Sequence, residues 1–273
     1  MRKHNRTMTR RDVLPTIGAA AAASAWLGMK SESAAAGLRG DRQIATNTYP
    51  WMTFARRAEQ SFEIHSDELL ADIASAGIAG YEPIIESVDE FDGLDRRLGQ
   101  HGLEMRSIYV NSALHEPSLA KESVARVSEI AAAAHELGTR IVVTNPSPIR
   151  WGGPENKSDA QLRTQAQALD RLGARLRDLG LSLAYHNHDA ELRQGGREFH
   201  HMLTATDPEH VRLCLDSHWV FRGCGDSEVA LFDALTHYWN RIVELHLRQS
   251  ADGVWTEVYA MEGDIDYTLL FEF

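Results

Sequence analysis

The stretch RDLGLSLAYHNHDAEL, residues 177–192, carries the pattern that decides the fold. Gly180 follows a helical repeat and marks its end, because glycine readily adopts the left-handed conformation found there. The apolar run that comes next has the length of one buried strand. Polar residues then crowd the end of the run, beginning at His186. The sequence therefore predicts a buried strand with polar side chains at its carboxyl end.

The same order of helix, glycine, apolar run and polar end recurs along the chain. Apolar runs predict strands at 43–49, 80–87, 104–111, 140–146, 181–187, 211–217 and 241–248. Apolar residues at helical spacing predict helices at 67–78, 90–101, 118–137, 158–179, 197–205 and 228–239. Strands that alternate with helices pair in parallel, because each helix carries the chain back to the side where the next strand starts. The expected fold class is α/β.

A (β/α)8 TIM barrel explains this alternation better than a doubly wound sheet does. No glycine-rich phosphate loop follows the first strand, where a dinucleotide-binding fold places one. Polar residues stand instead at the carboxyl end of nearly every strand, the rim on which such barrels carry their active sites. The expected barrel spans 37–273 and is truncated before its eighth strand, because 249–273 is too short for another helix and strand. An open barrel would expose its first and last strands as edges.

Residues 1–36 have the layout of an export signal. Arg10 and Arg11 precede an alanine-rich apolar run, and a small-residue cleavage site follows, placed after Ala36. The paired arginines resemble a twin-arginine signal, which predicts a periplasmic or extracellular protein. A membrane anchor is the alternative, but the run is interrupted and shorter than the roughly 20 residues of a spanning helix.

Charge and cysteine content restrict the function classes. A net charge of −11 argues against a protein that binds nucleic acid by neutralising phosphates. Cys214 and Cys224 are too few for a disulfide framework, and Cys214 lies in an apolar run, so a free buried thiol is expected there. Both features fit an enzyme that acts on small molecules.

Asp216, His218 and His246 are candidates for a metal site. Asp216 and His218 follow the sixth predicted strand at a spacing of two, which places both on one face if the strand continues. His246 lies late in the seventh strand, with Glu244 deeper on the same face. Carboxylate and imidazole together suit divalent ions such as Mn²⁺, Co²⁺, Zn²⁺ or Fe²⁺. The alternatives are a helix-capping aspartate beside a surface histidine, and a structural role for Glu244.

His186 and His188 share a face at the end of the fifth strand, with Asn187 opposite. One histidine can ligate a metal while the other moves a proton, since neutral imidazole does both near pH 7. Glu191, just beyond the rim, is a further acid/base candidate. A helix-capping loop, with Asp189 as the cap, is the alternative.

The loops beyond the strands offer substrate contacts. Arg150 and Trp151 lie in a proline-rich loop, 145–159, and an aromatic ring beside an arginine suits a sugar. Asn187, His218 and Arg248 are further candidates for substrate binding. The aromatic residues of 48–54 form either an apolar wall of the site or part of the core.

The rim stretches YHNHDAE (185–191), LDSHW (215–219), ELHLRQS (244–250) and MEGDIDY (261–267) together resemble sugar phosphate isomerases/epimerases with the xylose-isomerase-like barrel. The resemblance runs from residue 42 to the end. The chain is also similar to the secreted, twin-arginine subset of that group. It implies a divalent metal, most often Mn²⁺ with Co²⁺, Zn²⁺, Fe²⁺ or Mg²⁺ as alternatives, held by Glu, Asp, His and Glu of strands five to eight.

Two of the four implied ligands have counterparts here. Asp216 matches the strand-six aspartate and His246 the strand-seven histidine. Ala184 stands near the place of the strand-five glutamate, and His186 or His188 is the expected substitute. The strand-eight glutamate has no counterpart, and Glu191 resembles a substrate-contacting glutamate.

The leading hypothesis is a metal-dependent isomerase or epimerase of a sugar or keto-sugar. His186, His188 or Glu191 would move a proton next to a carbonyl, through an enediolate. The same first step serves a keto-glycoside lyase or hydratase. A non-catalytic, decayed sugar-binding barrel is a second hypothesis, and a phosphoesterase or endonuclease is a third, which the acidic charge opposes. The expected partner is a small-molecule sugar, with no nucleic acid and no stable membrane anchor, and a homo-oligomer is compatible with this.

Overall fold

The computed structural model describes residues 44–256 and 262–273. Residues 44–273 form one compact unit, and the predicted signal at 1–36 lies outside the described residues. Within the part that is described, no helix is both long and apolar enough to cross a membrane.

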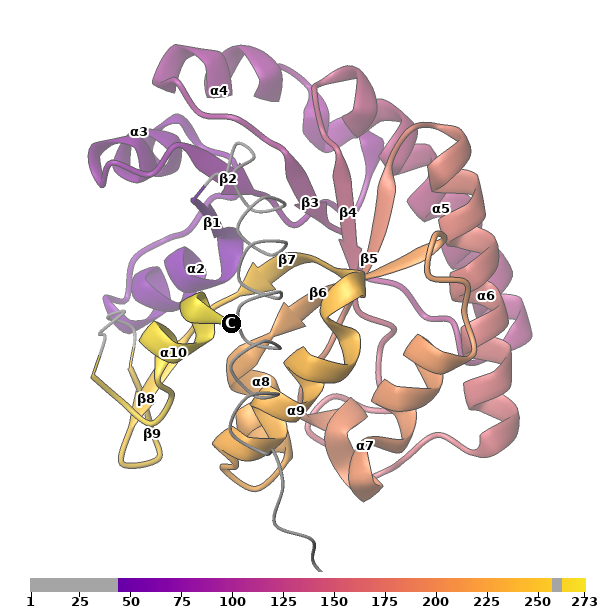
Figure 1. The fold of residues 1–273 in the computed structure, drawn as a ribbon. Coiled ribbons are helices and arrows are strands. Elements are labelled where there is room, and N and C mark those ends of the chain that lie inside the picture. Colours follow the sequence, from indigo (N-terminus) through magenta and orange to yellow (C-terminus); the bar gives the residue numbers. More distant parts are fainter. Residues whose placement is uncertain (1–43, 257–261) are drawn as a thin grey trace, which may run out of the picture. The chain divides into compact units, whose positions relative to one another are not determined.

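The described residues hold seven parallel strands and one antiparallel hairpin (Figure 1). The parallel strands are β1 Ala45–Asn47, β2 Gly80–Glu82, β3 Ser107–Tyr109, β4 Ile141–Thr144, β5 Ser182–His186, β6 Val211–Asp216 and β7 Ile242–His246. β1 pairs with β2, and β3 to β7 pair in sequence order. Isolated parallel bridges join β2 to β3, at Gly80 with Glu104 and at Ile84 with Tyr109. The predicted order of parallel strands is confirmed, and no eighth parallel strand occurs in the described ranges.

Helices follow the strands on the outside of the sheet (Figure 1). They are α2 Thr48–Arg57, α3 Asp67–Ser75, η1 Val88–Phe91, α4 Leu94–His101, α5 Pro117–Glu136, α6 Asp159–Asp178, α7 Asp189–Thr204, α8 Ser217–Gly223, α9 Glu228–Tyr238, η2 Trp239–Arg241 and α10 Tyr267–Glu272. Local signals set their ends: Ser158 and Gln161 form a capping box at the start of α6. Gly102 ends α4 in the left-handed conformation.

Three elements at the rim are absent from the sequence-based prediction. The expected aromatic wall at 48–54 is the helix α2, and α8 begins directly after Asp216. A short hairpin follows β7, formed by β8 Gln249–Ala251 and β9 Val254–Thr256. Because α8 starts at Ser217, His218 lies on a helix and the strand alternation expected for it does not apply.

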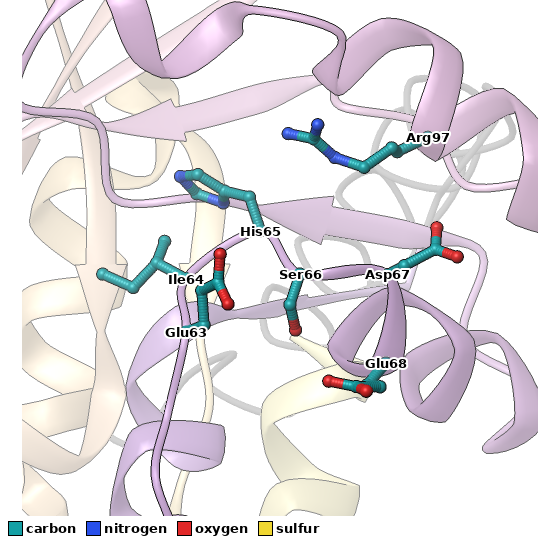
Figure 2. A pocket seen from close by; sticks show the side chains of 7 residues that line it. All are labelled: Glu63, Ile64, His65, Ser66, Asp67, Glu68 and Arg97. Atoms are coloured by element: carbon teal, nitrogen blue, oxygen red, sulfur yellow. The ribbon is translucent and has the colours of Figure 1, made fainter.

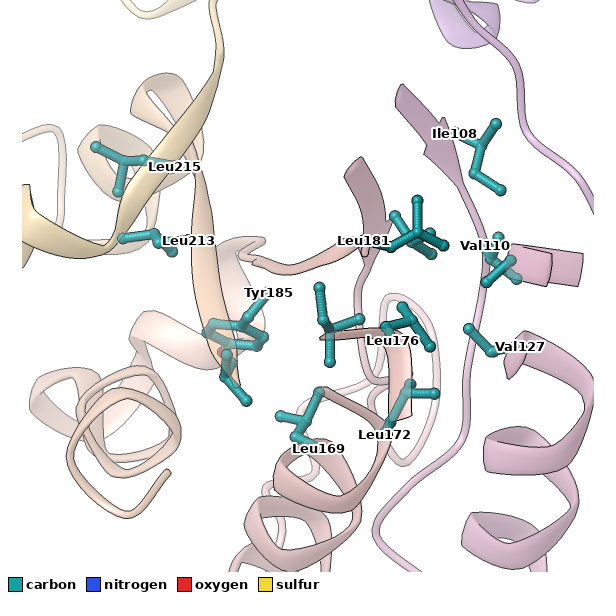
Figure 3. Packing of buried hydrophobic residues seen from close by; sticks show 14 of the residues in the cluster. Ile108, Val110, Val127, Leu169, Leu172, Leu176, Leu181, Tyr185, Leu213 and Leu215 are labelled. Carbon is teal, nitrogen blue, oxygen red and sulfur yellow. The ribbon is translucent and has the colours of Figure 1, made fainter. Parts of the chain in front are cut away.

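Two cores result from the alternation of side chains along the strands. The larger core fills the space between strands and helices; Figure 3 shows Leu169, Leu172 and Leu176 of α6 beside strand residues such as Tyr185 and Leu213. The smaller core lies on the opposite face of the strands, where Val143, Ala184 and Cys214 pack together. Cys214 is buried, Cys224 is partly buried, and both are free thiols, as the sequence predicts.

Candidate active site

Three imidazoles meet where β5 and β7 end. The ring of His186 lies 4.7 Å from that of His246 and 4.8 Å from that of His188, between ring centroids. Burial lowers the pKa of His186 well below its usual value and that of His188 to about 4. Both rings are therefore neutral at pH 7 and offer lone pairs to a metal ion or a proton.

His246 forms a buried ion pair with Glu82 of β2. Its Nε2 lies 3.1 Å from Oε1 of Glu82. Burial opposes a charge on His246, but its interactions with Cys214 and then with the Glu82 carboxylate outweigh burial and raise the pKa of His246 well above its usual value. Glu244 lies beside this pair, where burial and Glu82 raise its pKa to about 8, and it accepts a hydrogen bond from Ser107 at 2.9 Å.

Glu82 is a site residue that sequence reasoning missed. The polar residue near the carboxyl end of the predicted strand 80–87 is Glu86, which forms an ion pair with Arg126 at 3.2 Å and accepts a hydrogen bond from Asn111. Glu82 is buried, and its register partner is Asn47 of β1. A carboxylate inside an apolar run, directly before Pro83, is the signal that could have identified it.

The donor atoms of the cluster form two overlapping groups among the described residues. One consists of His186, Cys214 and His246, and the other of Glu82, Glu244 and His246; within each group the donor atoms lie within 4.8 Å of one another. Nδ1 of His186 and Oε2 of Glu244 are buried without a hydrogen-bond partner. Imidazole, thiol and carboxylate donors at this spacing fit a divalent cation.

Asp216, a predicted ligand, belongs to neither group. It pairs in register with His246, and burial raises its pKa to about 6. Its Oδ1 accepts the backbone N–H of Trp219 at 2.8 Å and so caps α8. Both interpretations of Asp216, as a metal ligand and as a helix cap, concern this one carboxylate. In the structure it caps α8.

Asn187 and Glu191 support the cluster from behind. The Asn187 amide donates to the backbone oxygen of Asp216 and accepts from its backbone N–H, at 3.2 and 3.1 Å. The Glu191 carboxylate is buried and accepts from the backbone N–H of His188 at 2.7 Å and from Asn145 at 3.3 Å. Burial, with Glu198 adding to it, raises the pKa of Glu191 to about 7. Both residues hold backbone in place.

Two tryptophans lie beside His188 at the carboxyl end of the strands. His188 lies 5.2 Å from Trp151 and 5.4 Å from Trp219, between ring centroids. Trp255 of the hairpin lies 4.9 Å from Trp219, and the Arg248 guanidinium stacks 3.9 Å from its ring. A polar floor with aromatic walls is the usual form of a small-molecule site.

His218 and Arg150, two predicted substrate-binding residues, differ in their surroundings. The His218 ring lies 4.0 Å from that of Trp255, is buried, and has neither nitrogen hydrogen-bonded among the described residues. Burial, followed by the charge of Arg248, lowers its pKa to about 4. Arg150 is exposed and forms an ion pair with Glu155 of its own loop at 2.6 Å. His218 thus joins the aromatic wall, whereas Arg150 is held within its loop.

A separate pocket lies at the start of α3, with His65 and Arg97 in its lining (Figure 2). Three of its polar side chains have structural partners: Ser66 caps α3, Asp67 pairs with His101, and His65 lies 3.5 Å from Glu90. None of the residues that line it belongs to the histidine cluster.

Known proteins resemble this chain in sequence and in fold. Residues 70–273 match the family model described as the xylose isomerase-like TIM barrel. Inosose dehydratase of Geobacillus kaustophilus (strain HTA426) is 24% identical over 193 residues, which cover 67% of this chain but only 61% of that enzyme. Inosose dehydratase of Lacticaseibacillus casei is 25% identical over 241 residues, covering 77% of this chain and 78% of that one.

Among solved structures, 3-keto-D-glucoside 4-epimerase of E. coli superposes with a TM-score of 0.62 at 15% identity, covering 85% of this chain and 86% of that one. A likeness at this identity concerns the fold alone. The residues matched by the family model include every strand from β2 onward and the histidine cluster. The predicted fold class is thereby confirmed, and the chain belongs to the xylose isomerase-like TIM barrel family.

Proposed function

We propose that this protein is a metal-dependent enzyme that removes a proton from the carbon next to the carbonyl of a keto-sugar or keto-polyol. One observation carries the proposal: His188, a neutral imidazole, stands under tryptophan cover beside the His186–His246 pair. The names of the relatives agree with it, because inosose and a 3-keto-glucoside are both ring ketones bearing hydroxyl groups.

His188 is the general base in this proposal. Its Nδ1 is buried without a hydrogen-bond partner among the described residues, and its low pKa keeps it unprotonated at pH 7. Glu191 fixes the backbone that carries it. His186 and His246 are the residues that would hold a divalent ion, with Asp216 at the end of the strand between them. When bound, such an ion polarises a carbonyl and its neighbouring hydroxyl.

The mouth favours a ring substrate over an extended one. Trp151, Trp219 and Trp255 present apolar faces on which the C–H face of a sugar ring can stack. Arg248 lies against Trp255, where its guanidinium can donate hydrogen bonds to substrate oxygens.

Three outcomes share the first step. The proton can return to the opposite face of the same carbon, which is epimerisation, or to the neighbouring carbon, which is isomerisation. Loss of the oxygen on the next carbon, as water or as an alcohol, is elimination. The names of the two inosose dehydratases favour elimination, and the name of the 3-keto-D-glucoside 4-epimerase favours epimerisation, as the outcomes to test first.

Solvent exchange tests the shared step whichever outcome follows. The metal-loaded protein is incubated in D₂O with an inosose and with a 3-keto-glucoside, and deuterium next to the carbonyl is measured by NMR. Wild type should incorporate deuterium, and His188→Gln should be slower by about 10²- to 10⁴-fold, the range of general base catalysis. The exposed His237→Gln on α9 serves as the matched control and should keep the wild-type rate.

Two results would contradict this function. If metal-loaded wild type exchanges no proton of either ketone yet binds them, the protein is a sugar-binding barrel without this activity. If His188→Gln exchanges as fast as wild type, another group is the base.

A further inference from the structure

Cys214 lies on β6, between the strands β5 and β7 that carry His186 and His246. In the strand register it lies opposite His186 of β5 and opposite Glu244 of β7. Its side chain is fully buried and forms no disulfide. One donor atom each of Cys214, His186 and His246 lies within 4.8 Å of the others. Three neighbouring strands thus bring a sulfur and two imidazoles to one point.

The contacts of the two histidines orient their rings toward Cys214. Metal-bound histidines commonly give their second ring nitrogen to a carboxylate, which orients the ring. Nε2 of His246 lies 3.1 Å from Glu82 in this way, and the same ring makes a side-chain hydrogen bond with Cys214, the contact that a bound ion would replace. His186 is 2% exposed, and its Nδ1 atom is buried with no hydrogen-bond partner among the described residues.

We propose that Cys214 is a thiolate ligand of the metal ion, together with His186 and His246, and that the site therefore selects a thiophilic ion such as Zn²⁺ over Mn²⁺. This inference rests on the proposed function, which requires a divalent ion at these histidines. Thiolate and imidazole donors suit zinc, whereas manganese and magnesium prefer carboxylate and water oxygens. Two histidines and one cysteine leave a fourth position open for a substrate oxygen, as catalytic zinc sites require.

Asp216 is the alternative third ligand on β6, and its carboxylate has another role. Its Oδ1 caps α8 through Trp219, and it belongs to neither group of clustered donors. Cys214 lies two residues earlier on the same face of β6, one level deeper. Cys214 is fully buried and forms no disulfide, so it is available as a thiol before an ion binds. When an ion binds, bonds form from the Cys214 sulfur and from a His246 nitrogen to the metal, and both the thiol proton and the second ring proton of His246 leave to solvent.

Cobalt substitution reports the ligand directly, without an activity assay. The metal-free full chain is titrated with Co²⁺, and the absorption spectrum is recorded for wild type, Cys214→Ser and Cys224→Ser. Wild type and Cys224→Ser should show a thiolate-to-cobalt charge-transfer band in the near ultraviolet. Cys214→Ser should lose this band while it keeps the weaker visible bands of bound Co²⁺.

X-ray absorption of the zinc-loaded wild type gives a second measurement that does not depend on a variant folding. A sulfur neighbour is expected at about 2.3 Å from zinc, beyond the nitrogen and oxygen shell at about 2.0–2.1 Å. If Co²⁺ and Zn²⁺ bind with nitrogen and oxygen neighbours alone, the cysteine ligand is refuted and the proposed function stands. If neither ion binds, both the ligand assignment and the metal-dependent function are overturned.

Discussion

At the scale of single residues, Glu191 shows how a carboxylate that looks catalytic in the sequence can serve the backbone. It is the third residue of α7, and its carboxylate accepts the backbone N–H of His188, the residue before the helix. Its second oxygen accepts from Asn145, which also donates to the backbone oxygen of His186 at 2.9 Å. One side chain therefore fixes the backbone of both histidine positions.

Replacing Glu191 should destabilise the protein before it affects chemistry. Glu191→Ala leaves the His188 N–H and the Asn145 amide without this acceptor, and a buried donor so deprived costs about 1–3 kcal/mol. Urea denaturation followed by circular dichroism should show a loss of about that size, and Glu191→Gln, which keeps one acceptor oxygen, should lose less. An unchanged unfolding free energy in Glu191→Ala would show that these hydrogen bonds contribute nothing.

At the scale of elements, α6 packs closest to the sheet at a glycine. A Cβ on Gly173 would lie 2.1 Å from the backbone oxygen of His210, immediately before β6. Gly173→Ala should therefore lower the free energy of unfolding by about 1–3 kcal/mol, the usual cost of overpacking. Gly99 on the exposed side of α4 has no atom within 4 Å of its Cβ position. Gly99→Ala is the control, and its helix propensity should stabilise the protein by up to about 1 kcal/mol.

The loop that carries Trp151 is attached to α7 by a buried ion pair. Nζ of Lys157 lies 2.6 Å from Glu198, with side-chain exposures of 1% and 11%. Lys157→Met leaves Glu198 buried without its counter-charge, which should cost about 3–5 kcal/mol. The double variant Lys157→Met/Glu198→Leu should recover much of that loss, because neither charge then remains. Equal losses in single and double variants, measured by urea denaturation, would contradict this account.

The order of the elements was predictable, whereas the elements at the rim were not. Strands and long helices such as α5 and α6 carry many apolar residues at regular spacing, so they can be predicted from the sequence. The helix α8 is short and starts at a strand end, so its first turn can be read as a continued strand. Of the two interpretations left open for Asp216 and His218, the structure shows the helix cap, with His218 buried on α8. β8 and β9 are three residues each, too short for periodicity to show.

At the scale of the whole molecule, the candidate site combines strands that are distant in sequence. His186, His188 and His246 come from stretches that the sequence identified as rim. Glu82 comes from β2 and pairs with His246 across 164 positions of sequence. Only closure of the strands toward a barrel brings them together, and no local pattern predicts which carboxylate will face which histidine. Cys214 was recognised as buried but not as a neighbour of two histidines, for the same reason.

The buried carboxyl groups should make the metal-free protein less stable as the pH rises from 6.5 to 8.5. The pKa of Glu191 is raised to about 7 and that of Glu244 to about 8, in both cases by burial first. A carboxyl group whose pKa is higher in the folded protein contributes fully to the free energy of unfolding below its pKa in the unfolded chain, near 4.3. This contribution is lost as the pH rises through the pKa of the group in the folded protein. His188 and His218 have lowered values near 4, so their contributions are complete above about 6.5 and add no slope there.

Urea denaturation at several pH values, with a chelator present, measures this slope. Wild type should lose unfolding free energy between pH 6.5 and 8.5, and Glu244→Gln should show a smaller loss because the group that titrates near 8 is gone, while His246, whose pKa is raised well above its usual value, still contributes to the slope. Glu122→Gln, an exposed change on α5, should keep the wild-type curve. A stability that stays level or rises over this range would mean that these carboxyl groups are already ionised in the folded protein, and Glu244 would then be a charged neighbour of the Glu82–His246 pair.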